Sequence, residues 1–239
     1  MFYILRSNYI SNTLLIVNLS VQYHNQQILH DVSINIPTGS IFGLLGDNGA
    51  GKTTLLKTIL GLNKHFSGSM TYNNQPLSRE QAKDFGALIE SPAIYPNLTA
   101  QENLRIMALL YNLSEPSISA TLHAVGLGDV SKKLKVKNFS LGMKQRLGIA
   151  MAIIHNPKFL ILDEPTNGLD MAGVDDFKTI VHTLAASGMT IMITTHQITE
   201  LATAFDAFAI LQHGKITYAS NSGGYSAEEL TTLYRDYND

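Results

Sequence analysis

The feature that most constrains this sequence is a glycine-rich segment at residues 46–53, which reads GDNGAGKT. It matches the P-loop pattern G-x-x-x-x-G-K-[ST] at every position. A short apolar stretch, residues 41–45, precedes it, and a helical pattern over residues 53–60 follows it. A strand, a glycine-rich loop and a helix in this order predict a phosphate-binding loop and not a chance turn.

The chemistry expected of this loop depends on its backbone and on two side chains. Backbone N–H groups and the positive end of the following helix would surround the phosphates of a nucleotide. Lys52 would reach the β- and γ-phosphates, and the Thr53 hydroxyl would ligate Mg²⁺. Kinases, GTPases and molecular motors all share this motif. The loop residues expected to bind the nucleotide are Gly46, Asn48, Gly49, Gly51, Lys52, Thr53 and Thr54.

Two acidic residues follow a second apolar strand. Residues 159–162 read FLIL and end in Asp163 and Glu164. Ligands of open α/β sheets lie beyond the carboxyl ends of the strands, so both acids are expected at the nucleotide. Asp163 would help to hold Mg²⁺, mainly through water, and Glu164 would orient and deprotonate the attacking water. The alternative is a pair of solvent-facing acids at a strand end.

A histidine follows a third expected strand, at residues 190–194. His196 would hydrogen-bond the γ-phosphate and position the attacking water, which makes it the second candidate catalytic residue after Glu164. A lone histidine is more often structural, and the chain contains eight histidines in all. Its place at a strand end distinguishes His196, and no role is assigned to the others.

The order of patterns predicts an α/β fold. We expect a P-loop NTPase core of RecA-like type with a mostly parallel sheet, an N-terminal antiparallel β part and an inserted helical subdomain. Strand-like patterns occur at residues 14–36, 69–72, 85–89, 207–211 and 215–219, and helical patterns at 99–112 and 174–186. The expected single domain, 14–239, comprises a catalytic core at 14–90 and 157–220, a helical subdomain at 91–156 and a C-terminal helix at 221–239, after a lead-in at 1–13.

Composition narrows the classes of function. The 239 residues include 17 basic and 19 acidic side chains, so nothing indicates a nucleic-acid partner. There is no cysteine, which excludes disulfides and thiolate metal sites. No run approaches the ~18 apolar residues that cross a bilayer, and the N-terminus does not read as a signal peptide. If the protein works in transport, another chain is expected to supply the membrane part.

One further segment resembles a known family. Residues 138–146 read NFSLGMKQR and lie between the P-loop and the acidic strand. They are similar to the L-S-G-G-Q-x-Q-R signature of ABC transporter ATP-binding subunits. The resemblance covers residues 14–219 and includes five motifs in the family's order. It implies ATP and Mg²⁺ as ligands and a second ATPase subunit, with each ATP between two head-to-tail copies.

The resemblance also assigns roles to single residues. Tyr23 matches the aromatic residue that stacks on adenine, and His196 matches the switch histidine. Asp170 matches an aspartate that contacts the partner subunit. The signature residues that would act on the ATP of the partner are Ser140, Leu141, Gly142 and Met143.

Two departures from the family pattern point to a subgroup. Glu90 stands where a glutamine is usual, and a carboxylate there can also ligate Mg²⁺. Leu141 and Met143 replace a glycine and the glutamine of the signature. Together with residues 92–99, these features resemble ATP-binding subunits of lantibiotic-immunity and bacitracin-resistance exporters.

That resemblance implies a peripheral protein at the cytoplasmic face of the plasma membrane. It would power the export or removal of an antimicrobial peptide through integral membrane permease subunits, and a homodimer would suffice. Four alternatives remain open: an ABC exporter of another substrate, a non-transport ABC ATPase, a P-loop phosphotransferase and a regulatory binding module.

Overall fold

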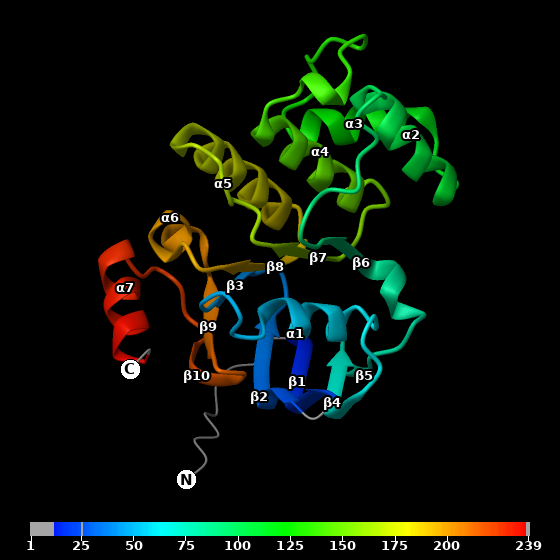
Figure 1. Ribbon diagram of the computed structural model, residues 1–239. Coiled ribbons are helices and arrows are strands. Elements are labelled where there is room, and N and C mark those ends of the chain that lie inside the picture. The colour runs from blue at the N-terminus through cyan, green and yellow to red at the C-terminus, as the bar shows by residue number, and fades with distance from the viewer. Residues whose placement is uncertain (1–11, 25, 238–239) are drawn as a thin grey trace.

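The computed structural model describes residues 12–24 and 26–237, and Figure 1 shows two sheets with helices packed around them. Most of the expected lead-in, 1–13, lies outside the described residues. The first strand begins at Asn12, before the expected start at Leu14. Within the described part of the chain, no helix combines the length and apolar character needed to cross a membrane.

The larger sheet has six strands in the order β10-β9-β3-β8-β7-β6. All neighbouring strands are parallel except β9 and β10, which are antiparallel. This topology confirms the predicted α/β core with a mostly parallel sheet. The strands are β3 (Ile41–Leu45), β6 (Phe85–Leu88), β7 (Phe159–Asp163), β8 (Thr190–Thr195), β9 (Ala207–Gln212) and β10 (Lys215–Ser220).

The smaller sheet is antiparallel and has the order β2-β1-β4-β5. The sequence indicated one strand-like stretch over residues 14–36, whereas the structure has two strands paired as a hairpin. The turn lacks both glycine and proline, and His24 adopts a φ of 52° there. The sequence offers one usual turn residue at this place, Asn25. The strands are β1 (Asn12–Tyr23), β2 (Gln26–Pro37), β4 (Phe66–Tyr72) and β5 (Gln75–Pro76).

The parallel sheet separates two hydrophobic cores. Alternate side chains of a strand point to opposite faces, so Ile41 and Leu45 pack into one core while Phe42 and Leu44 pack into the other. The first core lies beneath the helical layer, which includes α5 (Met171–Ala186). The second lies between the parallel sheet, the antiparallel sheet and α1 (Lys52–Ile59). Because both faces are covered, the strands β3, β7 and β9 are almost wholly apolar.

Three helices follow β6 and precede β7: α2 (Ala100–Leu110), α3 (Glu115–Ala124) and α4 (Leu141–Ile153). A capping box starts α2, because Thr99 Oγ1 accepts from the N–H of Glu102 and Glu102 Oε2 accepts from the N–H of Thr99. This backbone hydrogen bond, aided by Lys135, lowers the pKa of Glu102 to about 2. Figure 1 places this helical layer above the β7–β6 end of the parallel sheet.

The last helix of the described residues packs beside the segment that follows His196. After β8 come α6 (Ile198–Leu201) and the short 3₁₀ helix η3 (Ala202–Ala204), and α7 (Ala227–Asp236) packs against both. A capping box of Ser226 and Glu229 starts α7, which lies within the C-terminal helix expected at 221–239. Two other 3₁₀ helices are η1 (Gln81–Asp84) and η2 (Val136–Asn138).

Candidate functional site

Three neighbouring parallel strands end at one edge of the sheet and define the site. The loop after β3 is the P-loop, β7 ends in Asp163, and β8 leads into His196. The register pairs Leu45 with Thr195 and Asp163 with Thr194. Because these strands are parallel and adjacent, their carboxyl ends bring the three motifs together, as the strand-end argument predicted.

The P-loop forms a hollow of about 200 Å³. Gly51 caps α1 at a φ of 108°, a conformation that favours glycine. A side chain at Gly46 would run into the backbone oxygen of Leu211, so only glycine fits there. Every predicted P-loop residue except Gly46 lines the hollow, whose full lining is Ile28, Asp47, Asn48, Gly49, Gly51, Lys52, Thr53, Thr54 and Glu164.

Lys52 connects the P-loop to the acidic strand. Its side chain is buried, and Nζ donates to the backbone oxygens of Gly46 at 2.6 Å and Asp47 at 3.1 Å. The same ammonium lies 2.9 Å from Oε1 of Glu164. A buried cation needs partners of this kind. Phosphate oxygens entering the hollow would offer Lys52 further anionic partners.

Asp163 is fixed from both sides by hydroxyl groups. Thr53 Oγ1 donates to Oδ2 at 2.9 Å, and Thr194 Oγ1 donates to Oδ1 at 2.6 Å. No group of three or more His, Cys, Asp or Glu side chains that would hold a metal by itself occurs in residues 12–24 and 26–237. Mg²⁺ suits such a site, because it binds through one or two protein oxygens together with waters and phosphates.

Glu164 is held in an uncommon backbone conformation. Its φ is 49°, which costs a non-glycine residue roughly 1–2 kcal/mol. Its N–H donates to the carbonyl oxygen of Thr194 at 3.2 Å and to the hydroxyl at 3.0 Å. Nδ1 of His196 lies 2.7 Å from Oε2. Because a proton on Nδ1 would face the carboxylate, Nε2 would be left as an acceptor.

Thr194 was missed by the sequence analysis, although it contacts both acidic residues. It was treated only as the last residue of a strand. The signal that could have identified it is a threonine at the end of the neighbouring strand, because its hydroxyl can reach the Asp163 carboxylate. Recognising it required the strand order, which a single sequence does not state.

Glu90 pairs with a residue that the sequence analysis also missed. Its Oε1 lies 2.8 Å from Nζ of Lys57, one turn after Thr53 on α1. This hydrogen bond is the largest cause that lowers the pKa of Glu90 and raises that of Lys57. The charge of Asp163 also raises the pKa of Lys57, which places the pair within electrostatic reach of the expected Mg²⁺ ligands. Glu90 has a φ of 61°.

Tyr23 ends β1 and is 41% exposed. It is not among the residues that line the hollow of the P-loop. An adenine-stacking role for Tyr23 therefore remains a prediction.

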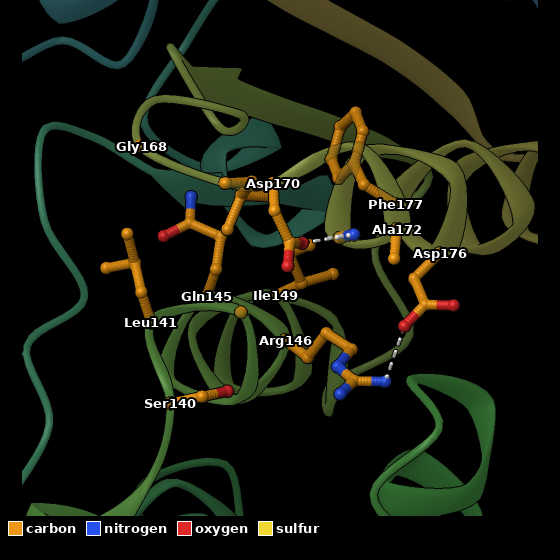
Figure 2. Close-up of a pocket in the computed structure, with 13 residues that line it drawn as sticks. Ser140, Leu141, Gln145, Arg146, Ile149, Gly168, Asp170, Ala172, Asp176 and Phe177 are labelled. Carbon is orange, nitrogen blue, oxygen red and sulfur yellow. Dashed lines mark hydrogen bonds and ion pairs between the residues drawn. The ribbon is translucent and has the colours of Figure 1, made fainter.

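Three of the four signature residues, Ser140, Leu141 and Gly142, line a second hollow of about 300 Å³ between the N-terminal ends of α4 and α5. The fourth, Met143, packs against the first core instead. Figure 2 shows Ser140, Leu141 and Gln145 on one side and Asp170, Ala172 and Phe177 on the other. Ser140 Oγ caps α4 by accepting from the N–H of Met143 at 3.2 Å. Asp170 Oδ1 caps α5 by accepting from the N–H of Gly173 at 2.8 Å. This hollow shares no lining residue with that of the P-loop.

Comparison with known proteins identifies the same family that the sequence motifs resemble. Residues 29–167, more than half of the chain, match the family "ABC transporter". The lantibiotic transport ATP-binding protein SrtF of Streptococcus pyogenes is 42% identical over 92% of this chain and 95% of its own. The bacitracin transport ATP-binding protein BcrA of Bacillus licheniformis is 42% identical over 83% of this chain and 66% of its own.

A solved structure agrees in fold. CbiO1 from Clostridium perfringens, part of the ABC transporter complex CbiONQ, superimposes with a TM-score of 0.81 and 28% identity. The match covers 88% of this chain and 89% of CbiO1. The P-loop, the acidic strand and the signature helix thus occur in the family's order on the family's fold, and this chain belongs to the ABC transporter family as one of its ATP-binding, ATP-hydrolysing subunits.

Proposed function

We propose that this chain hydrolyses ATP, bound with Mg²⁺, to power the removal of an antimicrobial peptide through separate membrane subunits. The observation that carries the ATPase part is the cluster in which Lys52 contacts Glu164 at 2.9 Å and Glu164 contacts His196 at 2.7 Å. An ion pair and a hydrogen bond thus connect the P-loop cation, the proposed base and the switch histidine.

The proposed roles follow from these contacts. Lys52 binds the β- and γ-phosphates, and Glu164 accepts the proton of the attacking water. His196 fixes the Glu164 carboxylate and offers its second nitrogen to the water or the γ-phosphate. Mg²⁺ held by Thr53 and Asp163, with Glu90 as a further oxygen ligand, would neutralise charge on the phosphates. Asn48, Gly49, Gly51 and Thr54 complete the phosphate cradle.

Each active site is proposed to need two copies of the chain. The signature and P-loop hollows have no lining residue in common, which supports a role for the signature on another subunit. Ser140 and Gly142 stand at the N-terminus of α4, where N–H groups and the helix dipole favour an anion. Two head-to-tail copies related by a two-fold axis would supply both halves twice.

Exposed apolar side chains support contact with a membrane subunit. Tyr95 follows β6 and is 54% exposed, while Leu109 and Leu110 at the end of α2 are 76% and 74% exposed. Apolar side chains exposed in this way mark interaction surfaces when they are grouped. Ile94, the neighbour of Tyr95, is partly buried and packs against the core. The proposed location is the cytoplasmic face of the plasma membrane.

The proposed substrate class rests on the relatives and on Glu90. Two relatives at 42% identity are named for lantibiotic and bacitracin transport. The Glu90 and Leu141 departures also resemble that subgroup. Export of another substrate is the alternative with the same chemistry, whereas a non-transport ABC ATPase would lack membrane partners.

The experiment is a protection assay in cells that carry this chain with its membrane subunits. Lys52→Ala should abolish growth in a lantibiotic or bacitracin at concentrations that the unchanged cells survive, because the phosphates lose their cation. Lys64→Ala, an exposed lysine beyond α1, is the matched control and should protect fully. Equal protection by Lys52→Ala would refute the P-loop assignment. If cells that lack this chain still survive both the lantibiotic and bacitracin, the proposed substrate class is refuted.

A further inference from the structure

The C-terminal helix contacts the P-loop through one hydrogen bond. The Tyr234 hydroxyl on α7 donates to Oδ1 of Asp47 at 2.8 Å, across 187 residues of sequence. Tyr234 is partly buried and packs against the core below the helical layer. Neither residue has a role in the motifs described above, although Asp47 lies inside the P-loop.

Asp47 connects this tyrosine to the phosphate-binding lysine. Its backbone oxygen accepts from Nζ of Lys52 at 3.1 Å, while its carboxylate accepts from Tyr234. Asp47 also lines the hollow of about 200 Å³. The Asp47 carboxylate would repel a triphosphate in this hollow unless it is held away from the phosphates or its charge is offset by a hydrogen-bond donor.

A second contact holds α7 at the same edge of the sheet. The helix packs against α6, which begins two residues after His196. Leu230 on α7 is fully buried, so this packing anchors the helix and fixes where Tyr234 can reach. Helix α7 thus contacts both the P-loop and the segment that follows His196. These two parts of the site are also connected to each other, through the contacts of Lys52 with Glu164 and of Glu164 with His196.

We propose that Tyr234 is a positioning residue for nucleotide binding: its hydroxyl holds the Asp47 carboxylate at α7 and so sets the P-loop for the phosphates. The inference rests on the proposed function, because it concerns ATP at this P-loop. Burial raises the pKa of Tyr234, and the hydrogen bond and charge of Asp47 raise it further. The hydroxyl therefore keeps its proton and remains a donor throughout the neutral pH range.

The test is a double-mutant cycle read by calorimetric titration of the full chain with ATP and Mg²⁺. Tyr234→Phe removes only the hydroxyl and should raise the Kd for ATP about three- to tenfold, the range for loss of one hydrogen bond. The kcat at saturating ATP should change less than about twofold. In the Asp47→Ala background there is no carboxylate to hold, so Tyr234→Phe should leave the Kd unchanged.

Two controls separate this inference from its alternatives. Tyr237→Phe, at the end of the same helix, should bind ATP like the unchanged chain. An equal effect of Tyr234→Phe with and without the Asp47 carboxylate would mean that Tyr234 acts through packing alone, which would overturn the proposal. No effect in either background would overturn it too.

Lys52→Ala separates this proposal from the proposed function. If Lys52→Ala binds ATP normally, the P-loop assignment itself fails. If Lys52→Ala loses binding while Tyr234→Phe binds as the unchanged chain does, only the role of Tyr234 fails.

Discussion

The Thr194 hydroxyl donates a hydrogen bond of 2.6 Å to Oδ1 of Asp163. The Oγ1 of Thr194 also accepts from the N–H of Glu164 at 3.0 Å. One side chain on β8 therefore positions both acidic residues at the end of β7. Thr194 is fully buried, so no water can replace it without rearrangement.

This arrangement makes Thr194→Val an informative substitution. Valine preserves the shape and removes the hydroxyl, which leaves a buried carboxylate oxygen without its donor. We expect the free energy of unfolding to fall by about 1–3 kcal/mol. The ATPase rate should fall about tenfold or more, and more Mg²⁺ should be needed for half-maximal activity, because Asp163 and Glu164 lose their shared support. Denaturant unfolding and a magnesium titration of ATPase activity measure these effects.

Thr190→Val is the matched control for this prediction. Thr190 lies at the opposite end of the same strand, is equally buried, and its Oγ1 accepts from the N–H of Gly39 at 2.9 Å. It should lose comparable stability but keep its magnesium requirement. If both variants shift the magnesium titration equally, Thr194 has no special role at the site.

Glu164→Gln separates binding from hydrolysis. Glutamine has nearly the same shape but cannot accept the proton of the attacking water, so the ATPase rate should fall by at least about a hundredfold. ATP should still bind and keep two copies together. Size-exclusion chromatography with ATP and Mg²⁺ should therefore show a dimer for this variant. Normal hydrolysis would place the base on another residue.

Glu90 and Lys57 form the second pair whose effect can be measured. Glu90→Gln restores the residue usual in the family and removes the partner of Lys57. We expect ATPase activity to survive, a higher magnesium requirement because an anionic ligand is lost, and altered peptide protection. Lys57→Gln leaves the Glu90 carboxylate without its cation and should shift the magnesium requirement in the opposite direction. Shifts in the same direction would show that the pair acts through helix packing and not through charge.

The sequence predicted those parts of the site that are encoded by short continuous segments. Residues 46–53 form a continuous motif, and Asp163 and Glu164 end an apolar strand, so a parallel sheet alone brings them together. The contact of Thr53 with Asp163 at 2.9 Å agrees with that argument. The catalytic and metal-binding roles of these residues remain predictions.

The features that the sequence did not reveal depend on tertiary structure. Thr194 and Lys57 carry no motif, and their importance follows from strand order and from one helical turn. Tyr234 reaches Asp47 across 187 residues, a contact that no local pattern encodes. The β1–β2 turn at His24 was missed because it lacks glycine and proline, and Asn25 was the one turn residue that could have indicated it.

The central claim is that each ATP site combines the P-loop of one copy with the signature of another. Two variants test it: Lys52→Ala disables the P-loop, and Gly142→Asp places a negative side chain at the signature. A Cβ at Gly142 meets only Leu169 Cδ2, at 3.8 Å, so the second variant should fold normally.

The decisive measurement is the ATPase rate of the two variants mixed in equal amounts. Each variant alone should be nearly inactive. Random pairing makes about half of the dimers mixed, each with one intact site of two, so the mixture should regain up to about a quarter of the unchanged rate. A mixture no more active than either variant alone, or a fully active Gly142→Asp chain, would contradict the account.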